Sequence, residues 1–159
     1  MKTIRNYIER AKKLKSWMPP RVEILLQQLG KVDIRLRKSM KLKPSHLDLM
    51  IENLIEAGND IKLIDWEYSA NADFRFDLAM FSFKGGLDKS GDELLIKTYY
   101  GKNRPELYAE LQAMKAVVCF REASWAILQR AISPIQFDYK KYATEHLADF
   151  EHYLVGHVV

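Results

Sequence analysis

The feature that most constrains this chain is a pair of short motifs in its first half. His46, Asp48 and Asn53 form the pattern H-x-D-L-x-x-x-N. Further along, a short apolar run ends in Asp65 and Glu67. An Ala-Gly-Asn-Asp turn lies between the two motifs, and apolar residues flank it, which predicts a β-hairpin. The sequence therefore predicts a polar loop that leads into a hairpin with an acidic end.

Most of the remaining chain has apolar residues at helical spacing. Pro19-Pro20 separates two helices near the start, and Ser133-Pro134 ends the longest helix. Ser90 to Glu93 is interpreted as a capping box that opens another helix. The fold is therefore expected to be mainly α with a small β-hairpin, because the strands are too few for an α/β sheet. The predicted helices cover residues 3–16, 21–38, 74–81, 90–99, 105–131 and 139–156.

The chain of 159 residues has a length that suits a single domain with one core. Its charge is uneven: residues 1–43 hold 13 Lys/Arg and 3 Asp/Glu, whereas the remainder holds 12 and 18. Such a basic segment can bind nucleic acid or an anionic surface. A solvated helix face is the favoured interpretation, because no aromatic stacking pattern accompanies the charge, and nucleic acid is not an expected partner.

Several features indicate a reducing cytoplasmic setting. The single cysteine, Cys119, cannot form an internal disulfide, and its apolar neighbours predict a small core residue. No stretch approaches the roughly 20 apolar residues of a membrane span, and the first residues lack the apolar region of a secretory signal. His146, His152 and His157 lack the spacing of zinc ligands and are expected at the surface.

The two motifs fit the needs of phosphoryl transfer. That reaction requires an acceptor for the proton of the attacking hydroxyl and oxygen ligands for Mg²⁺. The kinase pattern places the acceptor Asp five residues before a magnesium-binding Asn, and a second Asp follows the next hairpin. Asp48, Asn53 and Asp65 have this arrangement. Structural alternatives remain open: His46 could support the loop, Asn53 could cap a turn, and Asp65 could cap a helix.

Several segments resemble the choline/ethanolamine kinases, within the aminoglycoside-phosphotransferase-like kinases. The bacterial choline kinases of lipopolysaccharide decoration look most similar. The resemblance implies the C-terminal lobe of a protein-kinase-like fold, with residues 1–43 as a basic helical segment that leads into a lobe at 44–159. Within that lobe, 44–53 would be the catalytic loop and 54–65 the hairpin, followed by a helical remainder. The matching segments are 44–53, 63–68, 76–79, 124–129 and 132–143, so that the resemblance covers about 44–150.

The resemblance also implies roles for the residues of the two motifs. Asp48 would be the catalytic base toward the substrate hydroxyl, with His46 beside it in the catalytic loop. Asn53 and Asp65 would hold Mg²⁺, and Glu67 would support the metal or the substrate. ATP would be the phosphoryl donor.

The same resemblance implies a pocket for the acceptor. Trp125 and Tyr142 match positions that contribute to the choline pocket of the family, and Glu122 and Tyr68 are further candidates. A quaternary ammonium has no N–H donor, so aromatic faces are its natural partners. Packing in the core is the alternative role for Trp125, which lies beside apolar residues on a long helix.

The chain also departs from the family. Leu47 stands where family members very often have Asn, and Glu122 stands where the eukaryotic enzymes usually have a second Trp. The 43 residues before His46 predict helices, with no glycine loop or strand lysine to hold phosphates. The N-terminal β lobe is therefore expected to be absent, which leaves the ATP site incomplete.

Two functional hypotheses follow. The first is ATP- and magnesium-dependent phosphorylation of choline or a related small amino alcohol, with the missing lobe supplied by another chain or by a longer natural gene product. The alternative is a truncated, non-catalytic remnant that binds a small amine or acts as an interaction or dimerisation module. Self-association is expected in that case, because the loss of one lobe exposes apolar surface.

Overall fold

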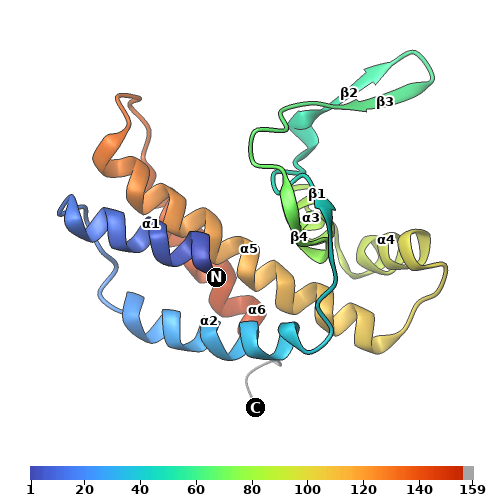
Figure 1. Cartoon of the computed structure of the whole chain (residues 1–159), viewed down its shortest axis with the longest axis horizontal. Coiled ribbons are helices and arrows are strands. Elements are labelled where there is room, and N and C mark those ends of the chain that lie inside the picture. Colours follow the sequence, from blue (N-terminus) through green and yellow to red (C-terminus); the bar gives the residue numbers. More distant parts are fainter. Residues whose placement is uncertain (156–159) are drawn as a thin grey trace. The chain divides into compact units, whose positions relative to one another are not determined.

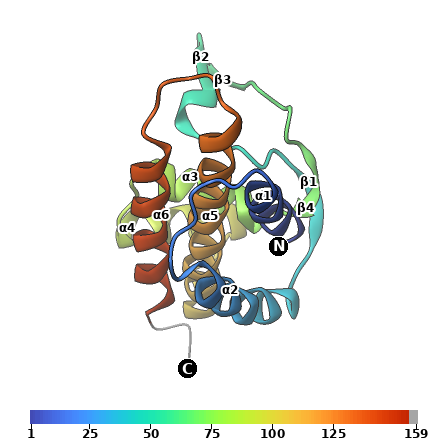
Figure 2. The same ribbon diagram turned by 90° about the vertical axis from the view of Figure 1, so that its left-hand side faces the viewer.

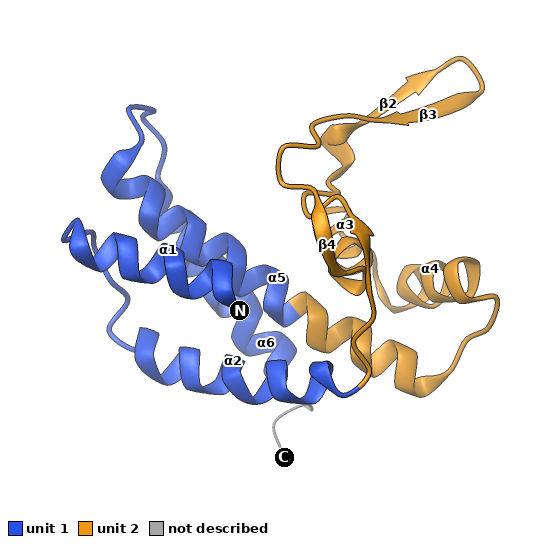
Figure 3. Ribbon diagram, in the orientation of Figure 1, with its two compact units in different colours: residues 1–38, 116–159 blue, residues 39–115 orange. Residues whose placement is uncertain are grey.

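A computed structural model describes residues 1–155 of the chain. The chain divides into two compact units (Figure 3): unit 1 comprises residues 1–38 and 116–159, and unit 2 comprises residues 39–115. The basic residues at the start therefore group with the C-terminal helices. The predicted single domain with a separate segment at 1–43 stays a prediction. The last residue of the helix predicted over 139–156, and His157, lie outside the described residues.

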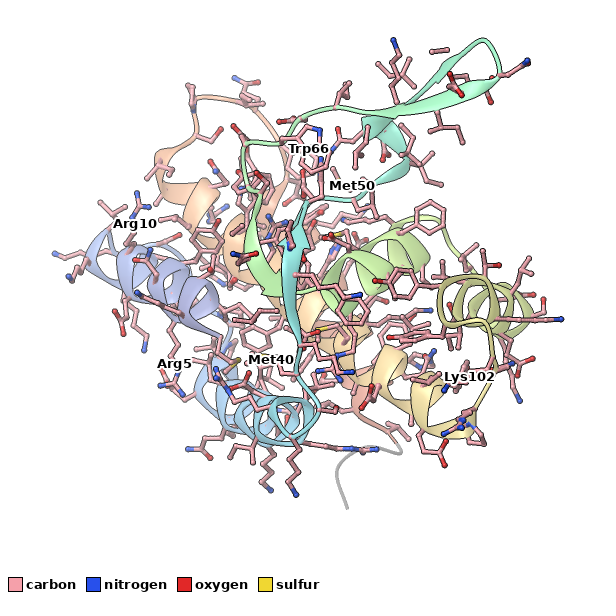
Figure 4. The ribbon with its side chains drawn as sticks, turned by 45° about the vertical axis from the view of Figure 1, so that its right-hand side comes forward. Arg5, Arg10, Met40, Met50, Trp66 and Lys102 are labelled. Atoms are coloured by element: carbon pink, nitrogen blue, oxygen red, sulfur yellow. The ribbon has the colours of Figure 1, made fainter. Side chains whose placement is uncertain are left out.

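Unit 1 consists of helices. They are α1 (Lys2–Lys13), α2 (Val22–Arg37), the second half of α5 (Pro105–Ile132) and α6 (Tyr139–Leu154) (Figure 1). All four were predicted from the spacing of apolar residues. Figure 2 shows α5 between α1 and α6. Arg5 and Arg10 are exposed and point away from α1 (Figure 4), as expected for a solvated basic face.

The core of unit 1 is built on the predicted apolar stripes. Ile4 and Ile8 of α1 are each 2% exposed, and Leu29 of α2 is fully buried. Phe120 of α5 and Phe150 of α6 meet edge to face, with ring centroids 5.0 Å apart. Each large side chain removed from water in this way contributes about 1.5 to 3 kcal/mol. Cys119 is fully buried and is the small core residue that the sequence predicts. The other buried apolar residues of this unit include Ala11, Val22, Leu25, Val32, Ala123, Ile127 and Leu147.

Unit 2 contains the predicted hairpin, formed by β2 (Leu54–Ala57) and β3 (Asp60–Leu63). Gly58 turns the chain with φ of +68°, a value that glycine adopts without strain. The mainly helical fold with a β-hairpin is confirmed. The other helical elements of this unit are η1 (Ile51–Asn53), α3 (Arg75–Lys84), α4 (Lys89–Tyr100) and the first half of α5.

A second two-stranded sheet was not predicted. It pairs β1 (Leu42–Ser45) with β4 (Ala70–Asp73), antiparallel, with Pro44 opposite Asn71. The expectations of loop from Pro44 onward and of only helix beyond the hairpin are wrong here. Both strands are four residues long and lack an apolar alternation, and one contains a proline, so neither carries the local signal of a strand.

The N-cap of α4 and the environment of Asp92, in the first turn of this helix, also differ from expectation. The N-cap is Asp88, whose side chain accepts the backbone N–H of Gly91 at 2.8 Å, so the capping box predicted at Ser90 is wrong. Asp92 is instead buried, and it forms an ion pair with the equally buried Lys115 of α5 at 2.7 Å. A buried charge requires such a partner, because desolvation of a lone ion costs several kcal/mol.

His146 is the remaining correction. It is 9% exposed rather than at the surface, and its Nδ1 lies 2.9 Å from the carbonyl oxygen of Tyr142. A carbonyl only accepts, so Nδ1 carries the proton. The ring also stacks on the ring of Tyr142, with centroids 4.0 Å apart. His152 is exposed, as expected. Within residues 1–155, no helix is both long enough and apolar enough to cross a bilayer.

Candidate active site

The loop that carries His46 and Asp48 is held from the first turn of α3. The carboxylate of Asp77 accepts the backbone N–H of His46 at Oδ2 and that of Leu47 at Oδ1, both at 2.7 Å. Hydrogen bonds to a charged acceptor are the stronger kind. In the sequence, Asp77 stood out only as part of the matching segment 76–79. Its role as the anchor of this loop was not predicted. It fixes the loop at the residues directly before Asp48.

Leu47 shows why this anchor matters. Its φ is +64°, in the left-handed region where a side chain such as leucine is strained by about 1 to 2 kcal/mol. Asparagine tolerates this conformation better. Leucine at the position where the resemblance expects Asn therefore makes the loop less stable by itself. The two backbone hydrogen bonds that the carboxylate of Asp77 accepts offset that strain.

His46 connects the loop with the end of the hairpin. It is 2% exposed. Its Nδ1 accepts the backbone N–H of Asp48 at 3.2 Å, and its Nε2 lies 2.8 Å from the carbonyl oxygen of Ile64. Because a backbone N–H donates and a carbonyl accepts, the ring is neutral with its proton on Nε2. Trp66, where the chain leaves the hairpin (Figure 4), meets this ring edge to face at 4.8 Å.

The register of the hairpin brings Asn53 and Asp65 to the same place. The backbone N–H of Ile64 donates to the carbonyl of Asn53 at 3.0 Å, so Asp65 lies one residue beyond the partner of Asn53. The side-chain Nδ2 of Asn53 donates to the carbonyl of Asp48 at 2.8 Å. That bond assigns the orientation of the amide and leaves its oxygen for another partner. Asp65 is exposed and has φ of +62°, a strained value of the kind that occurs at functional sites.

These two residues fit a magnesium ion. An amide oxygen and a carboxylate are hard ligands, and Mg²⁺ keeps several waters when few protein ligands are present. In the part of the chain that the structure describes, no group of three or more His, Cys, Asp or Glu side chains could hold a metal. A site of the expected kind would therefore rely on Asn53 and Asp65. Glu67 and Tyr68 lie in the exposed turn that follows, where the N–H of Ser69 bonds the carbonyl of Trp66 at 3.0 Å.

Three of the predicted acceptor residues, Glu122, Trp125 and Tyr142, lie in unit 1, on α5 and α6. The hydroxyl of Tyr142 donates to Oε2 of Glu122 at 2.7 Å, and Arg121 donates to Oε1 at 2.6 Å. The rings of Trp125 and Tyr142 are 6.1 Å apart at an angle of 67°. Glu122 is 5% exposed, so its charge is buried and both of its oxygens are engaged. Glu122, Trp125 and Tyr142 were predicted to form one pocket, and the structure places them in contact with one another through these bonds and ring pairs.

Two aromatic residues of this group were missed. Phe137 is 52% exposed, and its ring lies 5.0 Å from that of Tyr139 and 5.7 Å from that of Tyr142. Tyr139 also contacts Trp125, with centroids 6.0 Å apart. Edge-to-face pairs of this kind are the favoured geometry of aromatic rings. The density of aromatic residues between 125 and 142 was the available signal. We call Trp125, Phe137, Tyr139 and Tyr142 the aromatic cluster.

Comparison with known proteins gives the context of this arrangement. No family model matches the chain. A LicA homologue of Metamycoplasma hominis is 31% identical over 79 residues, which are 50% of this chain and 32% of that protein. LicA of Haemophilus influenzae is 32% identical over 77 residues, or 48% of this chain and 29% of its own. Thiamine kinase of Escherichia coli is 40% identical over 50 residues, or 28% and 18% of the two chains.

Solved structures match over nearly the whole chain. A choline/ethanolamine kinase family protein from Mesorhizobium loti superposes with a TM-score of 0.86 and 25% identity, over 96% of this chain and 53% of that one. The chain has a choline-kinase-like fold. Choline kinase LicA from Streptococcus pneumoniae agrees, with a TM-score of 0.74 and 20% identity over 92% of this chain and 54% of its own. The choline-kinase-like chain thus spans about half the length of these proteins.

The resemblance and the fold class predicted from the sequence are thereby confirmed: the structure matches the C-terminal lobe of such kinases. The matched share of the curated relatives is smaller, about a third of each LicA protein. The activities of those LicA proteins are therefore properties of longer chains than this choline-kinase-like lobe.

Proposed function

We propose that this chain is the phosphotransferase lobe of a kinase that transfers the γ-phosphoryl group of ATP to the hydroxyl of choline or a related small amino alcohol. One observation carries the proposal. The side chains of His46, Asn53 and Asp77 hold the loop around Asp48 through five hydrogen bonds and tie it to the residue before Asp65. A loop fixed so closely on both sides of one carboxylate is what positional catalysis requires.

In this proposal Asp48 accepts the proton of the substrate hydroxyl. The hydroxyl oxygen forms a bond to the γ-phosphorus, the bond to the bridging oxygen breaks, and ADP leaves. His46 is a positioning residue, because both of its ring nitrogens are engaged and it orients the N–H of Asp48. Asn53 positions the same residue from its carbonyl side.

Asn53 and Asp65 would hold Mg²⁺, with Glu67 as a nearby support. When bound, the ion would neutralise charge on the phosphates during transfer. The placement of Asn53 opposite Ile64 supports this role, because the residue that follows Ile64 is Asp65.

Trp125 and Tyr142 would bind the cationic end of the acceptor through their ring faces, and Tyr68 is a further candidate. Arg121 and Tyr142 already bond both oxygens of Glu122, so this carboxylate serves the structure of the cluster. A primary ammonium group needs oxygen acceptors for its N–H donors, whereas a quaternary ammonium needs aromatic faces. We therefore propose that choline is preferred to ethanolamine.

The nucleotide would need a further polypeptide. One solved neighbour, LicA, is described in complex with AMP. The choline-kinase-like chain spans about half of this LicA protein, and the helices α1 and α2, rather than a β lobe, lie before the loop around Asp48. We propose that the adenine site and the main phosphate clamp come from a separate chain or a further segment. A cytoplasmic location remains a prediction that rests on the single cysteine.

The experiment is a transfer assay on the full chain, mixed with the segment of Streptococcus pneumoniae LicA that lies outside the match as the source of the adenine site. The assay contains ATP, Mg²⁺ and choline, ethanolamine or thiamine, the last because of the thiamine kinase relative. We expect transfer to choline above the other acceptors, and a loss of at least about 100-fold in Asp48→Asn, which removes the proton acceptor. Glu56→Gln, an exposed change on β2, is the control and should have no effect. Equal transfer by the wild type and Asp48→Asn would overturn the proposal.

The alternative is a non-catalytic lobe that binds a small amine. Its supporting observation is that α5, α6 and the connection between them form the aromatic cluster without any residue of the loop around Asp48. Calorimetry separates the two proposals: choline binding that needs neither ATP nor Mg²⁺, without any transfer, supports the alternative. Trp125→Ala should abolish such binding, because one face of the aromatic cluster is removed.

A further inference from the structure

The outer edge of β3 offers free backbone groups at a definable position. The bond from Ile64 N–H to the carbonyl of Asn53 marks these two as a hydrogen-bonded pair. Hydrogen-bonded and non-hydrogen-bonded residue pairs alternate along an antiparallel ladder. The backbone N–H and C=O groups of Lys62 and Asp60 therefore also face β2. The N–H and C=O of Ile61 therefore point away from β2. Over residues 1–155, β3 pairs with no other strand.

The side chains at this edge are equally exposed. Ile61 is 70% exposed, although it lies in the middle of a strand. Within unit 2, the hairpin projects away from α3, α4 and the sheet of β1 and β4 (Figure 3). A hairpin of two strands is marginally stable alone, and an open apolar edge is a template for another strand.

We propose that β3 pairs antiparallel with β3 of a second copy of this chain, with Ile61 opposite the partner's Ile61 on a two-fold axis. The outward N–H of each Ile61 donates to the outward carbonyl of the other. The two hairpins then form one continuous sheet, and the dimer is closed, because the same edge is used by both copies.

Charge selects this register. With Ile61 on the axis, Asp60 of each copy lies opposite the partner's Lys62, in a non-hydrogen-bonded pair where side chains are closest. A slip of two residues in either direction places Lys62 opposite Lys62 or Asp60 opposite Asp60. A slip of one residue places the outward groups of Ile61 against groups that already bond β2.

The outer edge of β2 is a poorer candidate for self-pairing. By the same alternation, the groups of Glu56 point outward on that strand. Pairing centred on this residue would place Glu56 opposite Glu56, and like charges directly opposite are destabilising. The dimer that we propose is small, so it should be weak and depend on concentration. It does not depend on the proposed phosphotransfer.

The test uses sedimentation equilibrium of the full chain over increasing concentration. We expect the wild type to dimerise and each of Asp60→Lys and Lys62→Glu to weaken association roughly tenfold, since each places like charges opposite one another twice. The double variant, and an equal mixture of the two single variants, should regain wild-type association. A wild type that stays monomeric at every concentration would overturn the inference, and so would a double variant that does not recover.

A second pair of variants tests the backbone. Ile61→Pro removes the outward N–H but no donor to β2, so the hairpin should persist while the dimer is lost. Glu56→Pro makes the same change on the other edge and should dimerise as the wild type does. Equal association of Ile61→Pro and the wild type would refute the pairing of β3. If a proline variant does not fold, the variants Asp60→Lys and Lys62→Glu and their combination still decide the test.

Discussion

Replacement of Asp77 by alanine tests the idea that one carboxylate holds the catalytic loop. The change removes the acceptors for the N–H groups of His46 and Leu47, each bonded at 2.7 Å. A hydrogen bond to a charged group contributes about 1.5 to 3 kcal/mol. Water can replace part of this in a half-buried loop, so we expect the free energy of unfolding to fall by about 3 kcal/mol. Relief of the strain at Leu47 in the relaxed loop offsets a further part of the loss.

The assay combines urea unfolding with amide hydrogen exchange. Urea reports the free energy of unfolding, and the exchange rates of the His46 and Leu47 amides report opening of the loop itself. Asp138→Ala is the matched control: it removes a carboxylate that accepts one N–H, from Lys141 at 2.9 Å, at the N-cap of α6. It should cost about 1 kcal/mol and leave the exchange of the loop amides unchanged.

Two results would refute the reasoning. One is a free energy of unfolding for Asp77→Ala within about 0.5 kcal/mol of the wild type, the range of ordinary surface changes. The other is unchanged exchange of the His46 and Leu47 amides, which would mean that the loop keeps its conformation without the carboxylate.

Three further predictions concern stability. Lys15→Gly should raise the urea midpoint, with a gain of about 1 kcal/mol, because Lys15 follows Leu14, the C-cap residue of α1, with φ of +54°, where glycine is unstrained; a lower midpoint would contradict this. Lys115→Met should cost about 3 to 5 kcal/mol by leaving Asp92 buried without its cation, and the double change to Met and Leu at these positions should cost less; thermal unfolding that shows the reverse order would contradict this. Burial, with a smaller contribution from the charge of Glu110, raises the pKa of Tyr100 to about 12. Since tyrosine in the unfolded chain ionises near pH 10, the stability from its neutral form is complete below pH 10 and is lost toward pH 12; urea unfolding of Tyr100→Phe should lack this loss, and equal pH dependence would contradict the assignment.

The elements predicted from the sequence are those with a strong local signal. The long helices have apolar stripes over several turns, and the hairpin has a Gly-Asn turn between apolar strands. The sheet of β1 and β4 was missed because its strands are short and polar, and because its pairing joins residues 25 to 31 positions apart. Local periodicity carries no information about such a pairing.

In the candidate site, too, the residues with a local sequence signal were predicted and those without one were missed. His46, Asp48 and Asn53 were found because their spacing is a motif, and the structure joins them by hydrogen bonds. Asp77 was missed as an anchor because it binds backbone groups, which have no signature in the sequence. Phe137 was missed because an exposed ring in a loop has no periodicity. The roles assigned to these residues in catalysis remain predictions.

The central claim is that this choline-kinase-like chain carries the residues for phosphoryl transfer to choline. Its most direct test is to mix the full chain with the segment of Streptococcus pneumoniae LicA that lies outside the match, as the source of the adenine site. Choline, Mg²⁺ and ATP labelled with ¹⁸O in the γ-phosphoryl group are then added, and labelled phosphocholine is sought by mass spectrometry. The account predicts labelled product from the wild type and none from Asp48→Asn. Its absence from the wild type, or equal amounts from both proteins, would contradict the claim.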